Sequence, residues 1–125
     1  MEPNHPDTIT SELRITIGSR TFNATLLDNP TVKEFKSRLP LTITMSELNG
    51  NEKLYRFSTD LLVNPSNPGT ITTGDLMIYG SNTLVLFYKS FPTSYSYTKL
   101  GRIENSSGLA EVVGPGSVKI TFELK

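Results

Sequence analysis

Apolar and polar residues alternate along most of this chain, in short runs separated by turn residues. Near the N-terminus, Leu13, Ile15 and Ile17 would face one side of an extended strand, and polar residues the other. The alternation resumes after Gly18 and Ser19, where glycine suits the first position of a type II′ turn because it reaches positive φ without steric strain. The pattern predicts a β-hairpin at the start of an all-β domain.

Eight strands and two short helices are predicted. The strands are expected at residues 13–17, 22–26, 41–45, 53–57, 76–79, 84–88, 97–104 and 117–124. The first helix is expected from Pro30 to Leu39, because Asn29 can cap its start and Pro40 ends it. The second helix should end at Gly114, since glycine commonly terminates a helix.

The predicted strands favour a closed sheet. The runs at 76–79 and 84–88 are apolar on both faces, which is typical of strands covered on both sides. Eight strands is about the number at which a closed barrel is filled by its own side chains. We therefore predict a closed eight-stranded β-barrel with two short capping helices, and a two-sheet sandwich is the alternative. Phe22, Phe35, Leu86 and Ile120 should share its core, and Phe35, Leu39, Leu109 and Val112 should plug its ends.

Composition excludes several classes of function. The 125 residues include no cysteine, one histidine (His5), and twelve basic against twelve acidic residues. Thiolate chemistry and the usual metal ligands are therefore missing, and no net charge attracts nucleic acid. We expect no metal, no cofactor and no nucleic-acid partner.

Residues 1–10 are expected to form a flexible tail, because they offer almost nothing to bury, and residues 11–125 to fold as one domain. No secretory signal and no apolar run near the ~20 residues of a membrane span is visible. We expect a soluble protein without a membrane partner, and both a cytoplasmic and an exported location stay open. The oligomeric state is open as well.

Three stretches carry a family resemblance: LLDNPTVKEFKSRLPLTITM, PGTITTGDLMIYGSNTLVLFYKSF and SYSYTKLGRIENSSGLAEVVGPGSVKITFE. They resemble the bacterial cyclophilin-like proteins, small relatives of the eukaryotic-type cyclophilins that are mostly of unassigned function. The resemblance covers residues 13–123. It implies an eight-stranded barrel capped by two helices, which agrees with the pattern above.

The resemblance implies the fold more strongly than an activity. Prolyl isomerisation in the cyclophilins relies on a strand arginine, a proline pocket of Phe, Gln, Leu and Trp, and a histidine. This chain has no Trp and no Gln, and His5 lies outside the predicted domain. Arg56, within a mid-chain strand, is the residue that would carry the catalysis if the chain were an isomerase.

A charge-poor segment is the clearest candidate for a binding site. From residue 61 to 98, only Asp75 and Lys89 carry charge. This segment could be the barrel centre with a polar loop, or a neutral groove lined by the proline-rich loop 64–74 and the stretch FPTSYSYT. Tyr95 and Tyr97 would share a face of an extended segment, either as a binding surface or packed on the barrel wall. The candidate ligand-binding residues are Met45, Arg56, Phe91, Tyr95 and Tyr97.

Other carboxylates are predicted to have structural or solvent-exposed positions. Asp75 follows a glycine at a strand start, where aspartate commonly accepts backbone N–H bonds within a turn. Glu47, Glu52 and Glu104 lie near turns without paired-carboxylate spacing and are expected to be solvated. No base is placed to activate a serine or threonine, so hydrolase chemistry is not expected.

These observations lead to three hypotheses for function. The first is a binding module for a small neutral ligand or an extended peptide. The second is a peptidyl-prolyl cis-trans isomerase centred on Arg56. The third is a structural module of a larger assembly. A shared fold cannot choose between them, because function depends on the site.

Overall fold

The computed structural model describes residues 9–125, which contain ten strands and two helices. The strands are β1 (Ile9–Ile17), β2 (Arg20–Leu27), β3 (Leu41–Leu48), β4 (Glu52–Arg56), β5 (Thr70–Ile71), β6 (Asp75–Tyr79), β7 (Thr83–Phe87), β8 (Phe91–Pro92), β9 (Thr98–Ile103) and β10 (Val118–Leu124). The helices are α1 (Pro30–Lys36) and α2 (Leu109–Val113). Most of the predicted tail, residues 1–8, lies outside the described residues, and β1 already begins at Ile9, which pairs with Leu27.

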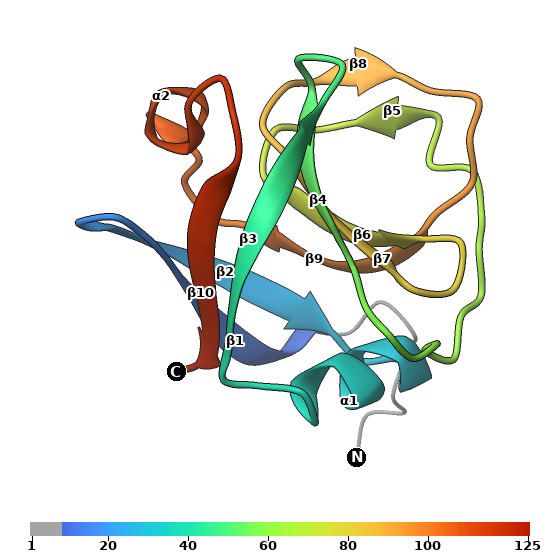
Figure 1. The fold of residues 1–125 in the computed structure, drawn as a ribbon. Helices are drawn as coiled ribbons and strands as arrows, with labels where there is room; N and C mark the ends of the chain where they lie inside the picture. Colours follow the sequence, from blue (N-terminus) through green and yellow to red (C-terminus); the bar gives the residue numbers. More distant parts are fainter. Residues whose placement is uncertain (1–8) are drawn as a thin grey trace.

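Eight strands close into an antiparallel barrel in the order β1-β10-β3-β4-β7-β6-β9-β2, and β2 returns to β1 (Figure 1). The all-β, closed-barrel prediction is confirmed, and the sandwich alternative is wrong. Closure pairs every barrel strand on both sides, which removes the free edges that favour aggregation. The strands β5 and β8, which the sequence pattern did not predict, form a separate two-stranded sheet beside the barrel.

The first hairpin forms as predicted. Ile17 pairs with Arg20, so the loop between β1 and β2 consists of Gly18 and Ser19. Gly18 has a φ of 61°, the left-handed region that glycine enters without strain. The register keeps Leu13 and Ile15 opposite Ala24 and Phe22, and all four side chains are buried.

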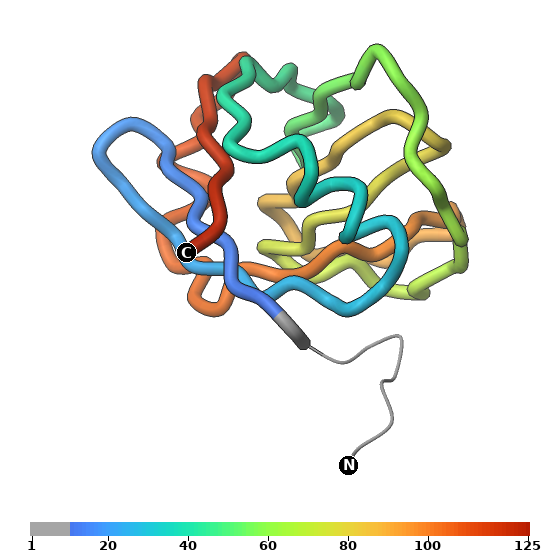
Figure 2. Tube along the Cα trace, turned by 90° about the horizontal axis from the view of Figure 1, so that it is seen from below, coloured from blue at the N-terminus to red at the C-terminus, as the bar shows by residue number. Residues whose placement is uncertain are grey.

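The two helices lie at different ends of the barrel (Figure 1), and Figure 2 shows the chain around α1 in front of the strands at its end. Asn29 caps α1 by accepting a hydrogen bond from the Val32 N–H, as predicted. The helix ends at Lys36 rather than Leu39, because the Arg38 and Leu39 N–H groups bond three residues back, a tighter winding than the α-helix. In the described part of the chain, no helix has the length and apolar character to cross a bilayer.

The barrel interior is one continuous hydrophobic core. Phe22, Phe35, Leu86 and Ile120 all belong to it, as predicted, and Phe35 meets Phe122 edge to face at 6.2 Å. From α2, Leu109 and Val113 are buried, whereas Val112 and Leu39 are only partly buried against the core. Val113 takes the position predicted for Val112 because residues four apart share a helix face.

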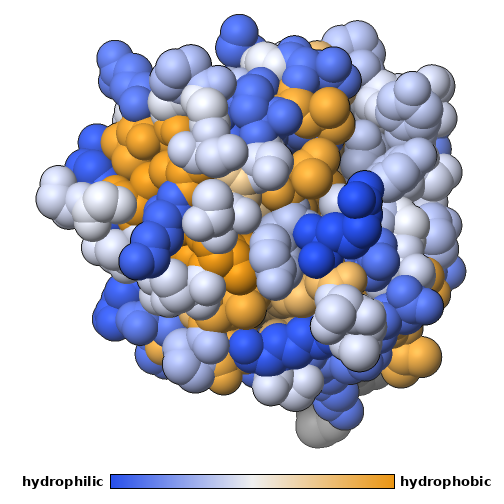
Figure 3. Space-filling model, viewed as in Figure 1, coloured by the Kyte–Doolittle hydropathy of each residue, from blue (hydrophilic) through white to orange (hydrophobic). Residues whose placement is uncertain are grey.

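A second, smaller hydrophobic cluster lies on the outer wall of the barrel. It consists of Ile71, Met77, Val85, Phe87 and Tyr97, with Leu54 and Phe91 packed against it. This cluster lies between the wall strands β4, β6 and β7 and the β5–β8 sheet. It explains why β6 and β7 are apolar on both faces. On the opposite side of Figure 3, towards α2 and β10, hydrophobic residues also gather at the surface.

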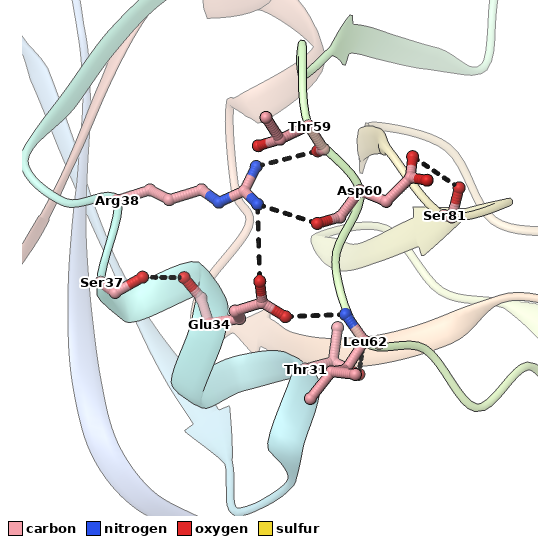
Figure 4. Close-up of polar contacts among 8 residues, drawn as sticks. All are labelled: Thr31, Glu34, Ser37, Arg38, Thr59, Asp60, Leu62 and Ser81. Atoms are coloured by element: carbon pink, nitrogen blue, oxygen red, sulfur yellow. Dashed lines mark hydrogen bonds and ion pairs between the residues drawn. The ribbon is translucent and has the colours of Figure 1, made fainter.

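A polar network fastens α1 to the chain that follows β4 (Figure 4). The Arg38 guanidinium donates to the carbonyl oxygens of Thr59 and Asp60 at 3.2 and 3.1 Å. Glu34 lies 3.7 Å from the same guanidinium and accepts a hydrogen bond from the Leu62 N–H at 2.7 Å. The network therefore fixes residues 59–62, which have no strand partner, against the helix.

We expect Arg38→Met to lower the free energy of unfolding by about 1–2 kcal/mol, because two carbonyls lose their donor. Urea denaturation at pH 7 measures the loss. Arg14→Met is the matched control, since Arg14 pairs with Glu123 at 3.7 Å and both side chains are partly exposed, a pair worth about 0–1 kcal/mol. Equal losses in the two variants would mean that Arg38 does not anchor this segment.

Candidate functional site

A groove of about 330 Å³ lies on the outer wall of the barrel. Alternate residues of β4 point to opposite faces, so Lys53 and Tyr55 face the interior side while the residues between and beside them face the groove. The groove is called the aromatic groove below. Its lining includes Glu52, Leu54 and Arg56 from β4 together with Tyr79, Phe91, Tyr95 and Tyr97.

The structure brings together four of the five candidate binding residues. Arg56, Phe91, Tyr95 and Tyr97 all line the aromatic groove, although they come from β4 and from the segment that begins with β8. Met45 does not, because it lies on the inward face of β3 and is fully buried in the barrel core. A period of two residues decides which face a strand residue occupies, so Met45 supports the barrel wall from inside.

The aromatic side chains form a connected cluster around Tyr79, which the sequence interpretation missed. The ring centroid of Tyr79 lies 6.2 Å from that of Tyr95 and 5.6 Å from that of Tyr97. Phe87 continues the cluster, 5.5 Å from Tyr97 and 5.8 Å from Phe91. Tyr95 is 62% exposed and Tyr97 only 5%, so Tyr97 packs on the barrel wall and Tyr95 offers its ring to solvent.

Arg56 is exposed at the groove. In residues 9–125 its guanidinium makes no hydrogen bond and no ion pair. By contrast, Arg14, Arg20, Arg38 and Arg102 each bind a carboxylate or a carbonyl. The Arg56 guanidinium is therefore free to donate to a carbonyl or carboxylate of a ligand.

Glu52 was predicted to be solvated, and this prediction is wrong. The residue is 8% exposed, lines the aromatic groove, and has no hydrogen-bond or ion-pair partner within the described part of the chain. Burial and the neighbouring charge of Glu47 raise the pKa of its carboxyl. No local pattern indicates this burial, because the β5–β8 sheet that covers this wall was not predicted.

Lys53, the next residue of β4, points the other way and is fully buried. Its ammonium donates to Glu47 Oε1 at 2.9 Å and to the carbonyl oxygens of Gly114 and Gly116 at 2.7 and 2.5 Å. All three donors of the ammonium are thus used. The group ties β3 and β4 to the chain between α2 and β10, which is a structural role.

Glu47 was also predicted to be solvated, but it is the centre of this network. Besides Lys53, it accepts hydrogen bonds from the Tyr88 hydroxyl at 2.7 Å and the Gly50 N–H at 2.6 Å. Desolvation opposes its ionisation, yet these hydrogen bonds hold its pKa below the usual value. Burial and the bond to Glu47 raise the pKa of Tyr88 to about 12.

Two predictions about single carboxylates hold. Asp75 caps its turn by accepting the Thr72 N–H at 2.8 Å, and it also binds Arg102 Nε at 2.5 Å. Glu104 is exposed. Across residues 9–125, no group of three or more His, Asp and Glu side chains is arranged to hold a metal ion.

The proline-rich loop lines other cavities. Pro68 and Thr70 border a cavity of about 380 Å³ beside Asp75 and Arg102, and Asn64 borders one of about 550 Å³. The expected single groove, lined by both this loop and the tyrosine segment, is therefore divided. The reason is that β5 pairs with β8 and Ser66 bridges to Tyr97, so the two segments run side by side and border different cavities.

A closed antiparallel barrel of eight strands with two short capping helices defines the cyclophilin-like class of folds. The model of the Cyclophilin-like family matches residues 15–123, and the chain belongs to this family. Its fold is similar to the solution structure of the hypothetical protein AF2241 from Archaeoglobus fulgidus, with a TM-score of 0.70 and 20% identity over 94% of this chain and 96% of that one. No curated protein matches the sequence.

Proposed function

We propose that this protein is a binding domain that holds an extended peptide in the aromatic groove. The observation that carries the proposal is the convergence of Tyr79, Tyr95 and Phe91 with the unpaired guanidinium of Arg56. Tyrosine rings supply large, rigid contact area at low entropic cost, and a free guanidinium can donate to the carbonyls that every peptide carries. The volume is at the lower end of the range for ligand sites, which suits a few side chains of a peptide.

The barrel has no free strand edge, and β5 and β8 have only two residues each, so strand addition offers a peptide few backbone hydrogen bonds. Its side chains must supply the contacts, with the aromatic rings as anchors. The alternative ligand is a small neutral molecule, which would use the same rings. Such a molecule would differ from a peptide in having no backbone carbonyls for Arg56 to bind.

The test uses an uncharged, blocked, proline-containing hexapeptide. We expect Tyr95→Ala to weaken its binding by ~1 kcal/mol or more, about fivefold, and Arg56→Ala to weaken it less, because aromatic anchors dominate such interfaces. Calorimetry measures the affinity, and amide chemical shifts locate the peptide. Tyr95 is largely exposed, so its removal leaves the fold intact.

Leu62→Ala is the control, since Leu62 is exposed beside the cavity of about 550 Å³. The control should leave the affinity unchanged. Binding that responds to Leu62 and ignores Tyr95 would place the ligand in that cavity and overturn the proposal.

A second candidate is peptidyl-prolyl isomerisation, which the free Arg56 beside aromatic rings favours. Isomerases lower the ~20 kcal/mol barrier of the Xaa-Pro bond by preorganised electrostatic stabilisation in a desolvated site. The chain lacks the Trp, Gln and domain histidine of the cyclophilins. We expect the protein not to accelerate the cis-trans isomerisation of the Xaa-Pro bond in a proline-containing test peptide. Turnover that disappears in Arg56→Ala would replace the binding proposal with this one.

A further inference from the structure

The two ends of the aromatic groove differ in charge. Glu52, Leu54 and Arg56 alternate along the outward face of β4 and line the groove in that order. At about 3.3 Å per residue, the backbone positions of Glu52 and Arg56 lie about 13 Å apart. An extended ligand along β4 would therefore meet a carboxylate at one end, an apolar side chain in the middle and a guanidinium at the other end.

The carboxylate end carries a negative charge that no cation of the described residues pairs with. Glu52 is more than nine-tenths buried, opens into the groove and has no partner in residues 9–125. The nearby Glu47 is a second carboxylate, and Lys53, the closest cation along the strand, is turned to the other face and bound to Glu47. No buried side-chain oxygen in the described residues lacks a partner, so the unpartnered Glu52 carboxylate still reaches solvent through the groove. A carboxylate that is partly desolvated and has no counterion attracts a cation more strongly than one in bulk water.

The aromatic rings add to the same preference. Tyr97 lies near Glu52, whose charge contributes, after burial, to the raised pKa of the Tyr97 hydroxyl. Tyr79 packs against both Tyr97 and the exposed Tyr95. The faces of tyrosine rings attract cations, and this attraction grows where water is excluded.

We propose that the Glu52 end of the aromatic groove is a subsite for a cationic side chain, so that the peptide ligand carries a lysine or arginine there. The aliphatic stem of such a side chain lies against Leu54 and the tyrosine rings, and its charge meets Glu52. Arg56 binds a carbonyl or an acidic group further along the peptide. This inference rests on the proposed function and specifies its ligand.

The experiment uses blocked hexapeptides in which one lysine moves through each position, and a matched series with acetyl-lysine in its place. Acetylation removes the charge and keeps the stem. At one position we expect the lysine peptide to bind at least fivefold tighter than its acetylated partner. Glu52→Gln should abolish this difference. Glu104→Gln, at an exposed site, is the matched control and should keep the preference.

The outcomes separate the two proposals. If no peptide of either series binds, the proposed function fails. If peptides bind but lysine and acetyl-lysine are equivalent at every position, or if Glu52→Gln keeps the preference, the cationic subsite is wrong and the binding domain stands. Should Glu52→Gln fail to fold, the wild-type protein gives the answer, because acidification that protonates Glu52 must remove the lysine preference. A preference that persists in acid would overturn the subsite.

Discussion

Replacing Gly101 with alanine is expected to prevent the barrel from closing as it does here. Gly101 lies in β9, between Leu26 of β2 and Leu76 of β6. A Cβ atom at this position would lie 2.0 Å from the Thr25 carbonyl oxygen and 3.2 Å from the Leu26 Cα. These are backbone atoms of a paired strand, so the contact cannot be relieved by a side-chain rotation.

We expect Gly101→Ala to lose more than about 4 kcal/mol of unfolding free energy, a large part of the 5–15 kcal/mol of a typical domain. Circular dichroism during urea denaturation measures this loss, and a two-dimensional amide spectrum shows whether the fold persists. Gly116→Ala is the matched control, since a Cβ there meets no atom within 4 Å and its φ lies outside the left-handed region. Equal stability of the two variants would contradict the close approach of β9 to β2.

The second large effect is expected from Lys53→Met. Removing the ammonium leaves Glu47 without its cation and two carbonyl oxygens, of Gly114 and Gly116, without their donor. Breaking a buried pair from one side typically costs about 3–5 kcal/mol, because the remaining charge is uncompensated. Urea denaturation at pH 7 measures the loss. Lys119→Met, on the exposed face of β10, is the matched control and should change the stability little.

The pH dependence of this loss has a definite sign. The native network holds the pKa of Glu47 below its usual value. The stabilisation that ionised Glu47 contributes to the folded state is therefore fully present above the pKa of the unfolded carboxyl, about 4.3. It is lost as the pH falls through the native pKa. The difference in unfolding free energy between the wild type and Lys53→Met should therefore become smaller in acid. Adding Glu47→Gln to Lys53→Met should recover part of the loss at pH 7. A double variant no more stable than Lys53→Met would show that the uncompensated carboxylate is not the cause.

Local pattern was sufficient for the eight barrel strands, the start of α1 and most of the core. The alternation of Leu13, Ile15 and Ile17 marks a strand wherever it is placed, because the side chains of a strand change face at every residue. Asn29 before Pro30 predicts a helix start from cap chemistry alone, and the structure has it there. Runs that are apolar on both faces predicted β6 and β7, and both are covered from inside and outside.

The extent of short elements was less accessible from local pattern. The β5–β8 sheet has two residues in each strand, too few to show a periodicity, and its partners are about twenty residues apart in the chain. The early end of α1 likewise depends on hydrogen bonds three residues back, which the spacing of apolar residues does not reveal.

The sequence by itself therefore determined the barrel strands, the start of α1 and most of the core, because periodicity and turn chemistry are local properties. It favoured a closed barrel over a sandwich, and the pairing of the strands decided between the two. The tertiary structure alone decided which side chains meet. Arg56 and Tyr95 share the aromatic groove and Met45 does not, since register sets the face of each strand residue. Glu52 is buried and Lys53 is paired because β-strand closure and the β5–β8 sheet bring distant segments over them, and such long-range contacts leave no local signal.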